Sequence, residues 1–135
     1  MKMTEFNSKW QIIEANQQSV FNFLKDLRNF EKLMPEQVIN YQASGNRCSF
    51  TIKGMTSLSL IIDEAREHQL IRLIPEGKAA FEFELVAHIK AADVRSEVKI
   101  SLDAKLNPMM AMMAKRPLQN LIEIMVDKLS QQQIQ

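Results

Sequence analysis

The strongest constraint on the fold is a change in hydrophobic period near residue 38. From there to residue 105, apolar and polar residues alternate in short runs, most clearly in AFEFELVAHIK (80–90) and SEVKISLDAK (96–105). A period of two is typical of strands with one buried and one solvated face, and the short turns between the runs predict antiparallel hairpins. Because the apolar face of such a sheet must pack against another layer of structure, the sequence predicts a helix packed on this sheet.

Helical patterns flank the alternating segment on both sides. Before it, SKWQIIE (8–14) predicts a strand, and Asn16 is a favourable N-cap for the apolar residues at helical spacing that follow. NFEKLMP (29–35) predicts a second short helix that ends at its proline. After the strands, Asn107 and Pro108 form a favourable start for a long final helix. The order predicts an α+β protein.

Composition is that of an ordinary globular domain and argues against several function classes. The 135 residues suit a single domain, 1–135, and 46% of them are hydrophobic against 24% charged. A net charge of +1 without a basic block argues against nucleic-acid binding. No apolar run approaches the roughly 20 residues that span a bilayer. One cysteine and no secretory signal at the N-terminus predict a cytoplasmic protein.

The predicted order resembles the helix-grip fold of the START and Bet v 1-like superfamily, also called SRPBCC or polyketide cyclase/dehydrase and lipid transport. SVFNFLKDLRNFEKLMP (19–35) is similar to the superfamily's aromatic-rich first helix and the short helix after it. LNPMMAMMAKRPLQNL (106–121) looks like the C-terminal helix of small bacterial members. The resemblance covers the whole chain. It implies a curved antiparallel sheet of six to seven strands around the long helix, with two short helices after the first strand.

In such a fold a cavity can lie between the sheet and the long helix. The dry strand faces and one helix face would line it, and the small side chains of Ala111 and Ala114 would leave room for a ligand. Candidate cavity-lining residues are Phe50, Ile52, Leu58, Leu60, Phe81, Phe83, Leu85, Ile100, Met110, Ala111, Ala114 and Leu118. Polar candidates for the cavity mouth are Tyr41, Ser57, Ser59 and Asn107.

Four methionines crowd the start of the last helix, at positions 109, 110, 112 and 113. A straight helix places Met109, Met112 and Met113 opposite the buried face, as a contact surface for a partner such as a second copy of the chain. Pro117 lies inside this helix, and a kink there would turn the methionines toward the cavity. Three interpretations of the four methionines stay open: they form an adaptable part of the core, the wall of a cavity, or an external contact surface.

No motif for a specific reaction is present. The inward strand faces carry no group that transfers protons, because the alternation places His88 on the outward face. Cys48 has no paired base. Because His68 and His88 lack ligand spacing and no glycine-rich phosphate loop occurs, we expect no metal and no cofactor.

The leading hypothesis is a non-enzymatic protein that binds a small hydrophobic molecule, such as a lipid, fatty acid, quinone or polyketide-like compound. It rests on the mostly apolar inward faces. The resemblance implies two alternatives, which are a cyclase/dehydrase-type enzyme acting on a hydrophobic substrate and a protein-interaction module of the co-chaperone or ribosome-associated type.

Overall fold

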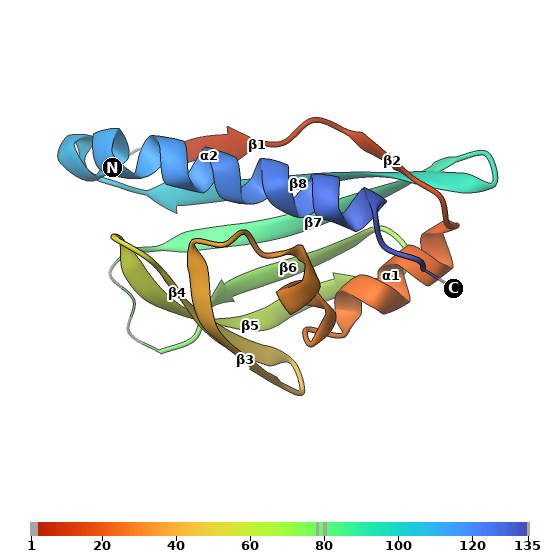
Figure 1. Cartoon of the computed structure of the whole chain (residues 1–135), viewed down its shortest axis with the longest axis horizontal. Coiled ribbons are helices and arrows are strands. Elements are labelled where there is room, and N and C mark those ends of the chain that lie inside the picture. The colour runs from red at the N-terminus through yellow and green to blue at the C-terminus, as the bar shows by residue number, and fades with distance from the viewer. Residues whose placement is uncertain (1–2, 78, 80, 135) are drawn as a thin grey trace.

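The computed structural model describes residues 3–77, 79 and 81–134. One curved sheet and two helices make up most of this part of the chain (Figure 1). The elements in chain order are β1 (Met3–Asn7), β2 (Gln11–Ile13), α1 (Gln17–Lys25), the 3₁₀ helix η1 (Asn29–Leu33), β3 (Val38–Ser44), β4 (Arg47–Ile52), β5 (Thr56–Arg66), β6 (Leu70–Pro75), β7 (Phe83–Ala92), β8 (Arg95–Lys105) and α2 (Pro108–Ser130).

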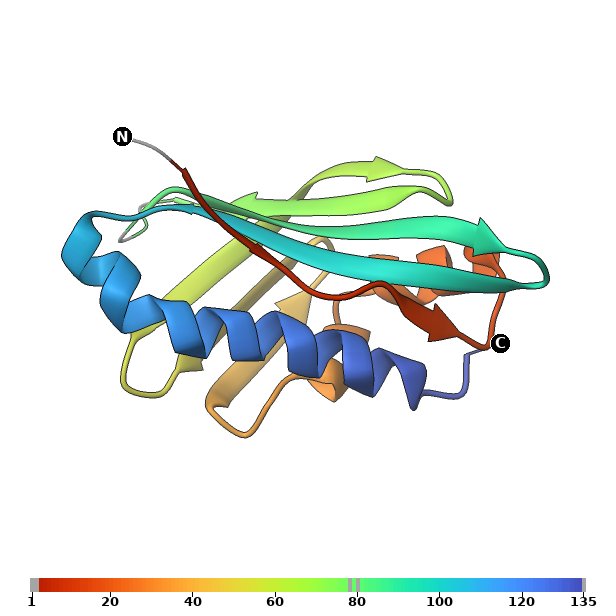
Figure 2. The same cartoon turned by 90° about the horizontal axis from the view of Figure 1, so that it is seen from above.

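All strands described belong to one antiparallel sheet in the order β1–β8–β7–β6–β5–β4–β3, and β2 also pairs with β8. From β3 to β8 each strand pairs with its sequence neighbour, as the short turns predict. Figure 2 shows α2 running along the inner side of the curved sheet, with α1 and η1 on the same side. This is the α+β helix-grip architecture that the sequence predicts, with eight strands rather than six to seven.

The first predicted strand, residues 8–14, is wrong in its extent. The chain instead forms β1 and β2, separated by a break at Ser8. The Ser8 hydroxyl accepts a hydrogen bond from the Ile100 backbone N–H at 2.9 Å, and the Ser8 N–H donates to the Ile100 carbonyl at 2.9 Å. A side chain thus takes the place of a backbone acceptor, and the regular ladder stops there.

Both predicted helix caps are confirmed. The Asn16 side chain accepts the Ser19 N–H at 2.8 Å, and the Asn107 side chain accepts the Met110 N–H at 2.8 Å. Each bond satisfies a backbone donor that the first helical turn leaves unpaired. Pro108 occupies the first position of α2, where its missing N–H costs nothing. Neither helix has the length and apolar composition to cross a membrane, within the residues described.

The helix α2 has a firmly held second half. Its inward face there is apolar, with Leu118, Leu121, Ile122, Met125 and Leu129 all buried.

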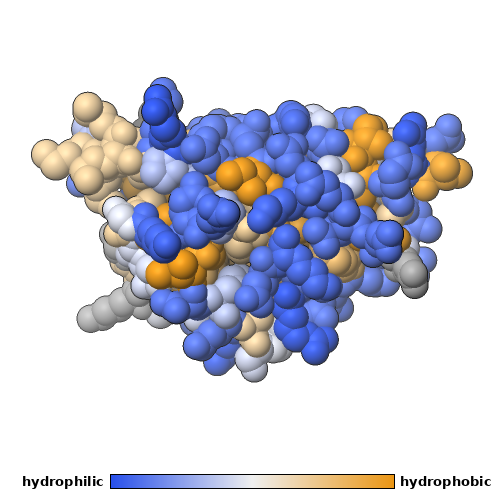
Figure 3. All heavy atoms as spheres, viewed as in Figure 1, coloured by the Kyte–Doolittle hydropathy of each residue, from blue (hydrophilic) through white to orange (hydrophobic). Residues whose placement is uncertain are grey.

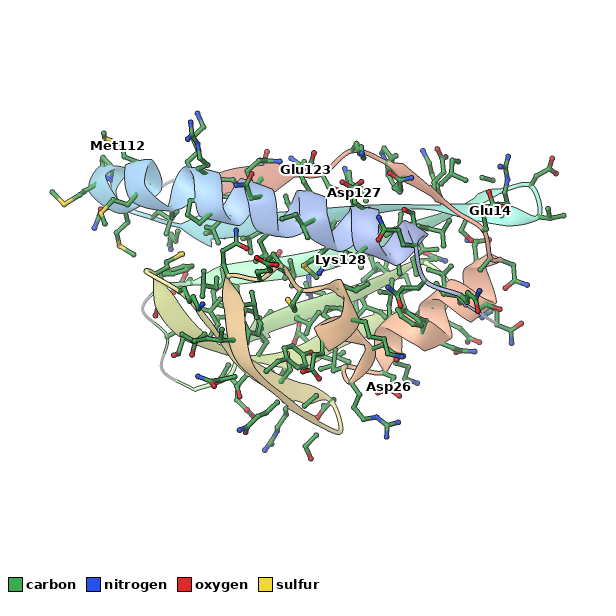
Figure 4. All side chains as sticks on the ribbon, viewed as in Figure 1. Glu14, Asp26, Met112, Glu123, Asp127 and Lys128 are labelled. Atoms are coloured by element: carbon green, nitrogen blue, oxygen red, sulfur yellow. The ribbon has the colours of Figure 1, made fainter. Side chains whose placement is uncertain are left out.

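Polar contacts also hold this second half on both sides. Glu123 accepts the Lys9 backbone N–H at 3.1 Å, and Asp127 forms a 2.9 Å ion pair with the Lys9 ammonium. On the other side of the helix, Lys128 donates to the Met34 carbonyl at 2.7 Å (Figure 4).

The first half of α2 is held much less firmly. Between Pro108 and Pro117 only Ala114 is buried. No side chain from Met109 to Pro117 forms a hydrogen bond or ion pair with another described residue. Pro117 also lacks the N–H that would bond the Met113 carbonyl, so the helical ladder is interrupted where the two halves meet.

Candidate functional site

The space between the sheet and α2 is almost completely filled. The void that remains has a volume of about 10 Å³, which is close to the minimum for one water molecule. The room predicted opposite Ala111 and Ala114 is therefore missing from this structure, and neither alanine lines the void. Among the described residues the lining of the void is apolar, formed by Phe50, Leu58, Leu60, Phe81, Phe83, Leu85, Leu102, Leu118 and Leu121.

Most of the predicted cavity-lining residues surround this void, but five lie elsewhere. Ile52 lines a pocket at the surface, and Ile100 and Ala114 are buried in other parts of the core. Met110 is half-buried at the edge of the core. Ala111 lies in a shallow groove between α2 and β1, because the start of α2 runs beside that strand.

A more open pocket of about 190 Å³ lies between α2 and the end of the sheet formed by β3 and β4. It begins at the surface and reaches Leu121, which also lines the interior void. Ile52 in its wall is two residues from Phe50 of the void on the same face of β4. Its full lining is Pro35, Gln37, Val38, Ile52, Lys53, Arg116, Pro117, Asn120 and Leu121. The surface pocket and the void are therefore neighbouring parts of one apolar region.

The polar residues of the surface pocket are not those predicted from the sequence. Ser57 and Ser59 are exposed on the opposite face of β5 from Leu58, and Ser57 lies 2.8 Å from the Thr51 hydroxyl. Asn107 is used in capping α2. The pocket instead uses Gln37, Lys53, Arg116 and Asn120. A straight helix would place Arg116 and Asn120 opposite the buried face of α2, and their position on either side of Pro117 is the sequence signal that could have located them.

Tyr41 points into the core rather than to the pocket. Its hydroxyl donates to the Leu27 carbonyl at 2.6 Å, and its ring stacks on Phe50 at 5.9 Å between ring centroids. Burial, together with nearby Cys48, raises the pKa of Tyr41. Burial also raises the pKa of Cys48. Both groups are therefore neutral near pH 7 and poorly suited to exchange protons there.

Other titratable groups lie on the outer face of the sheet. His88 Nε2 is 3.1 Å from the Ser101 hydroxyl, and burial followed by the charge of Lys99 lowers the pKa of His88. Glu5, Asp103 and Glu84 stand side by side across β1, β8 and β7. Burial and then these two neighbours raise the pKa of Asp103. These residues do not line the surface pocket or the void, which leaves both without an acid–base pair.

Comparison with solved structures identifies the fold. A START superfamily protein from Mycobacterium smegmatis aligns with a TM-score of 0.67 at 14% identity, covering 97% of this chain and 99% of that one. Norcoclaurine synthase from Thalictrum flavum gives 0.70 at 10% identity, with 96% and 85% covered. A conserved protein from Geobacillus kaustophilus gives 0.71 at 12% identity, with 95% and 93% covered.

The sequence matches no family model, and no curated protein matches it significantly. At such low identities the structural likeness concerns the fold alone. It extends over nearly the whole chain, including the sheet, the two short helical segments and the long C-terminal helix. The chain therefore has the START and Bet v 1-like helix-grip fold.

Proposed function

We propose that the protein binds a small hydrophobic molecule between the sheet and α2. The surface pocket of about 190 Å³ carries this proposal, because its apolar wall continues through Leu121 to the interior void, whose described lining is apolar throughout. A lipid, fatty acid, quinone or polyketide-like compound would bury its apolar part there. Ligand sites are typically concave, mostly apolar and supplied with a few polar groups at defined places.

The filled interior is compatible with this proposal if the walls separate when the ligand binds. Ligand pockets commonly occupy about 300 Å³ or more. An empty apolar cavity of about 300 Å³ would cost about 7 kcal/mol, taking about 24 cal/mol per Å³. That approaches the whole stability of a typical domain, about 5–15 kcal/mol. A protein without ligand is therefore expected to close the space.

The first half of α2 is the wall best suited to move. Only Ala114 is buried between Pro108 and Pro117, and Pro117 interrupts the helical hydrogen bonds at the edge of the pocket. Segments with few buried contacts open at the lowest free-energy cost. The second half, tied through Lys9 and Met34, would stay in place.

Native mass spectrometry of the purified protein, followed by denaturing extraction, tests the proposal. We expect one hydrophobic molecule per chain, or saturable one-to-one binding of an added fluorescent fatty-acid analogue to protein purified empty. The absence of both a retained molecule and saturable binding would refute it. The cyclase/dehydrase alternative has less support, because the described lining of the surface pocket and the void holds no acid–base pair, and Tyr41 and Cys48 in the core both stay neutral.

A second proposal concerns the methionine surface, which we define as Met109, Met112 and Met113. These residues are 72%, 83% and 72% exposed. Figure 3 shows an apolar patch at the end of the molecule where α2 begins, and Figure 4 places Met112 at that end. Isolated exposed apolar residues are common, but three together are typical of a contact surface. A second copy of the chain is the partner we propose. The surface is smaller than the ~800 Å² that each partner of a stable complex buries, so the contact would be weak.

Light scattering over a range of protein concentrations tests this contact. We expect the monomer mass of 15.6 kDa in dilute solution and a rising average mass at high concentration. Met112→Glu places a charge in the centre of the surface and should abolish that rise while leaving the fold unchanged, because Met112 packs little in the monomer. An average mass that rises equally in the variant would contradict the proposed dimer surface.

A further inference from the structure

The described lining of the surface pocket carries positive charge and no carboxylate. Lys53 and Arg116 are its charged lining residues, and both are exposed at its rim. The chain has six arginines, and five of them form ion pairs with carboxylates at 2.7 to 3.4 Å. Arg116 is the exception among the described residues. A guanidinium left unpaired beside an apolar pocket is available to an external anion.

The polar and apolar parts of the pocket are separated. Lys53 follows the last residue of β4 and Arg116 precedes Pro117, so the two cations approach the rim from opposite walls. Asn120 and Gln37 add amide groups. Val38, Ile52 and Leu121 form an apolar wall, and Leu121 leads to the interior void. The arrangement matches a molecule with a charged head and an apolar chain.

Building on the proposed binding function, we infer that the ligand is an anionic amphiphile whose carboxylate or phosphate head is held by Arg116 and Lys53 and whose chain runs past Leu121. A guanidinium offers paired N–H donors that match the two oxygens of a carboxylate or phosphate, and lysine adds a point charge. A neutral head gains only ordinary hydrogen bonds at this rim. The pocket should therefore prefer an anion over a neutral molecule of the same chain length.

The test compares decanoate, decyl phosphate and 1-decanol, which share a ten-carbon chain, on the full-length protein. Their dissociation constants are measured by displacement of a fluorescent fatty-acid analogue at neutral pH. We expect at least one anion to bind about tenfold or more tightly than decanol, which corresponds to about 1.4 kcal/mol. The double variant Lys53→Gln/Arg116→Gln should lose most of this preference and bind decanol unchanged.

Lys115→Gln is the matched control. Lys115 is also exposed and without an ion pair among the described residues, but it lines the groove beside β1 instead of the pocket. Either single substitution, Lys53→Gln or Arg116→Gln, removes one positive charge as Lys115→Gln does and should weaken the preference for anions, whereas Lys115→Gln should keep it in full. Equal affinity of the native protein for decanol and both anions would overturn the inference of an anionic head and leave the proposed function standing. A preference that survives in the double variant would also overturn it. If none of the three compounds binds, the proposed function itself fails.

Discussion

Replacing Leu121 with alanine is expected to destabilise the protein by about 3 kcal/mol and to strengthen its binding of hydrophobic molecules. Leu121 is 5% exposed and lines both the surface pocket and the interior void. Buried leucine-to-alanine changes cost about 2.7–5 kcal/mol, because apolar contacts are lost and a cavity remains. Here the removed side chain separates two spaces, so its loss should join them into one site open to solvent.

The two effects are measured by urea unfolding with and without decanoate. A ligand that binds only the folded state stabilises it in proportion to the logarithm of its affinity, so tenfold tighter binding adds about 1.4 kcal/mol at high ligand concentration. The Leu121→Ala protein should therefore be less stable than the native protein when empty and recover more stability when decanoate is added.

Leu129→Ala provides the matched control. Leu129 lies in the same helix and is completely buried, but it lines neither the surface pocket nor the void. Its replacement should cost a similar free energy of unfolding without a gain in ligand binding. If decanoate stabilised both variants by the same amount, Leu121 would have no special place between the two spaces, and the proposed path for the ligand chain would be wrong.

Much of the fold was predictable because, in a strand with one buried face, every second residue is apolar and buried. Phe83 and Leu85 are buried on β7 while Glu84 between them is partly exposed, and the hairpins follow from the turns. The break at Ser8 had no such signal. It depends on Ile100, which is 92 residues away in the sequence, so only the assembled sheet reveals which hydroxyl replaces a backbone acceptor.

The candidate site was predictable in its chemistry and not in its shape. The alternation along the strands correctly predicts that the residues on the inward face of the sheet form apolar walls. Whether those walls enclose space depends on how side chains from several elements pack together. The surface pocket combines residues from three separate segments, which no local pattern relates to one another: Pro35, Gln37 and Val38; Ile52 and Lys53; and Arg116, Pro117, Asn120 and Leu121. A helical wheel assigns Arg116 to the outside, yet the outer edge of α2 at that point is also the rim of the pocket.

Replacing Pro117 with alanine is expected to stabilise the protein by about 1–3 kcal/mol and to slow ligand binding. Alanine restores an N–H donor to the Met113 carbonyl, and proline inside a helix costs about 3 kcal/mol relative to alanine. Part of the gain is offset because proline also restricts the unfolded chain. The restored bond would join the loosely held first half of α2 to the second half that Lys9 and Met34 hold.

Two measurements separate stability from access. Amide hydrogen exchange should slow between residues 109 and 116, because local opening of that segment now breaks an additional hydrogen bond. Stopped-flow binding of a fluorescent fatty-acid analogue should show a lower association rate than in the native protein. Lys115→Ala is the control, since it changes an exposed position in the same turn without adding a donor, and it should alter stability by no more than about 0.5 kcal/mol.

The combination of results decides which wall moves. Slower exchange together with slower association would mean that the first half of α2 must open before the ligand reaches the core. A more stable helix with an unchanged association rate would contradict that mechanism, because the cost of opening would have risen without affecting access. The ligand would then have to pass between η1 and β3, where Pro35 and Val38 form the opposite side of the same pocket.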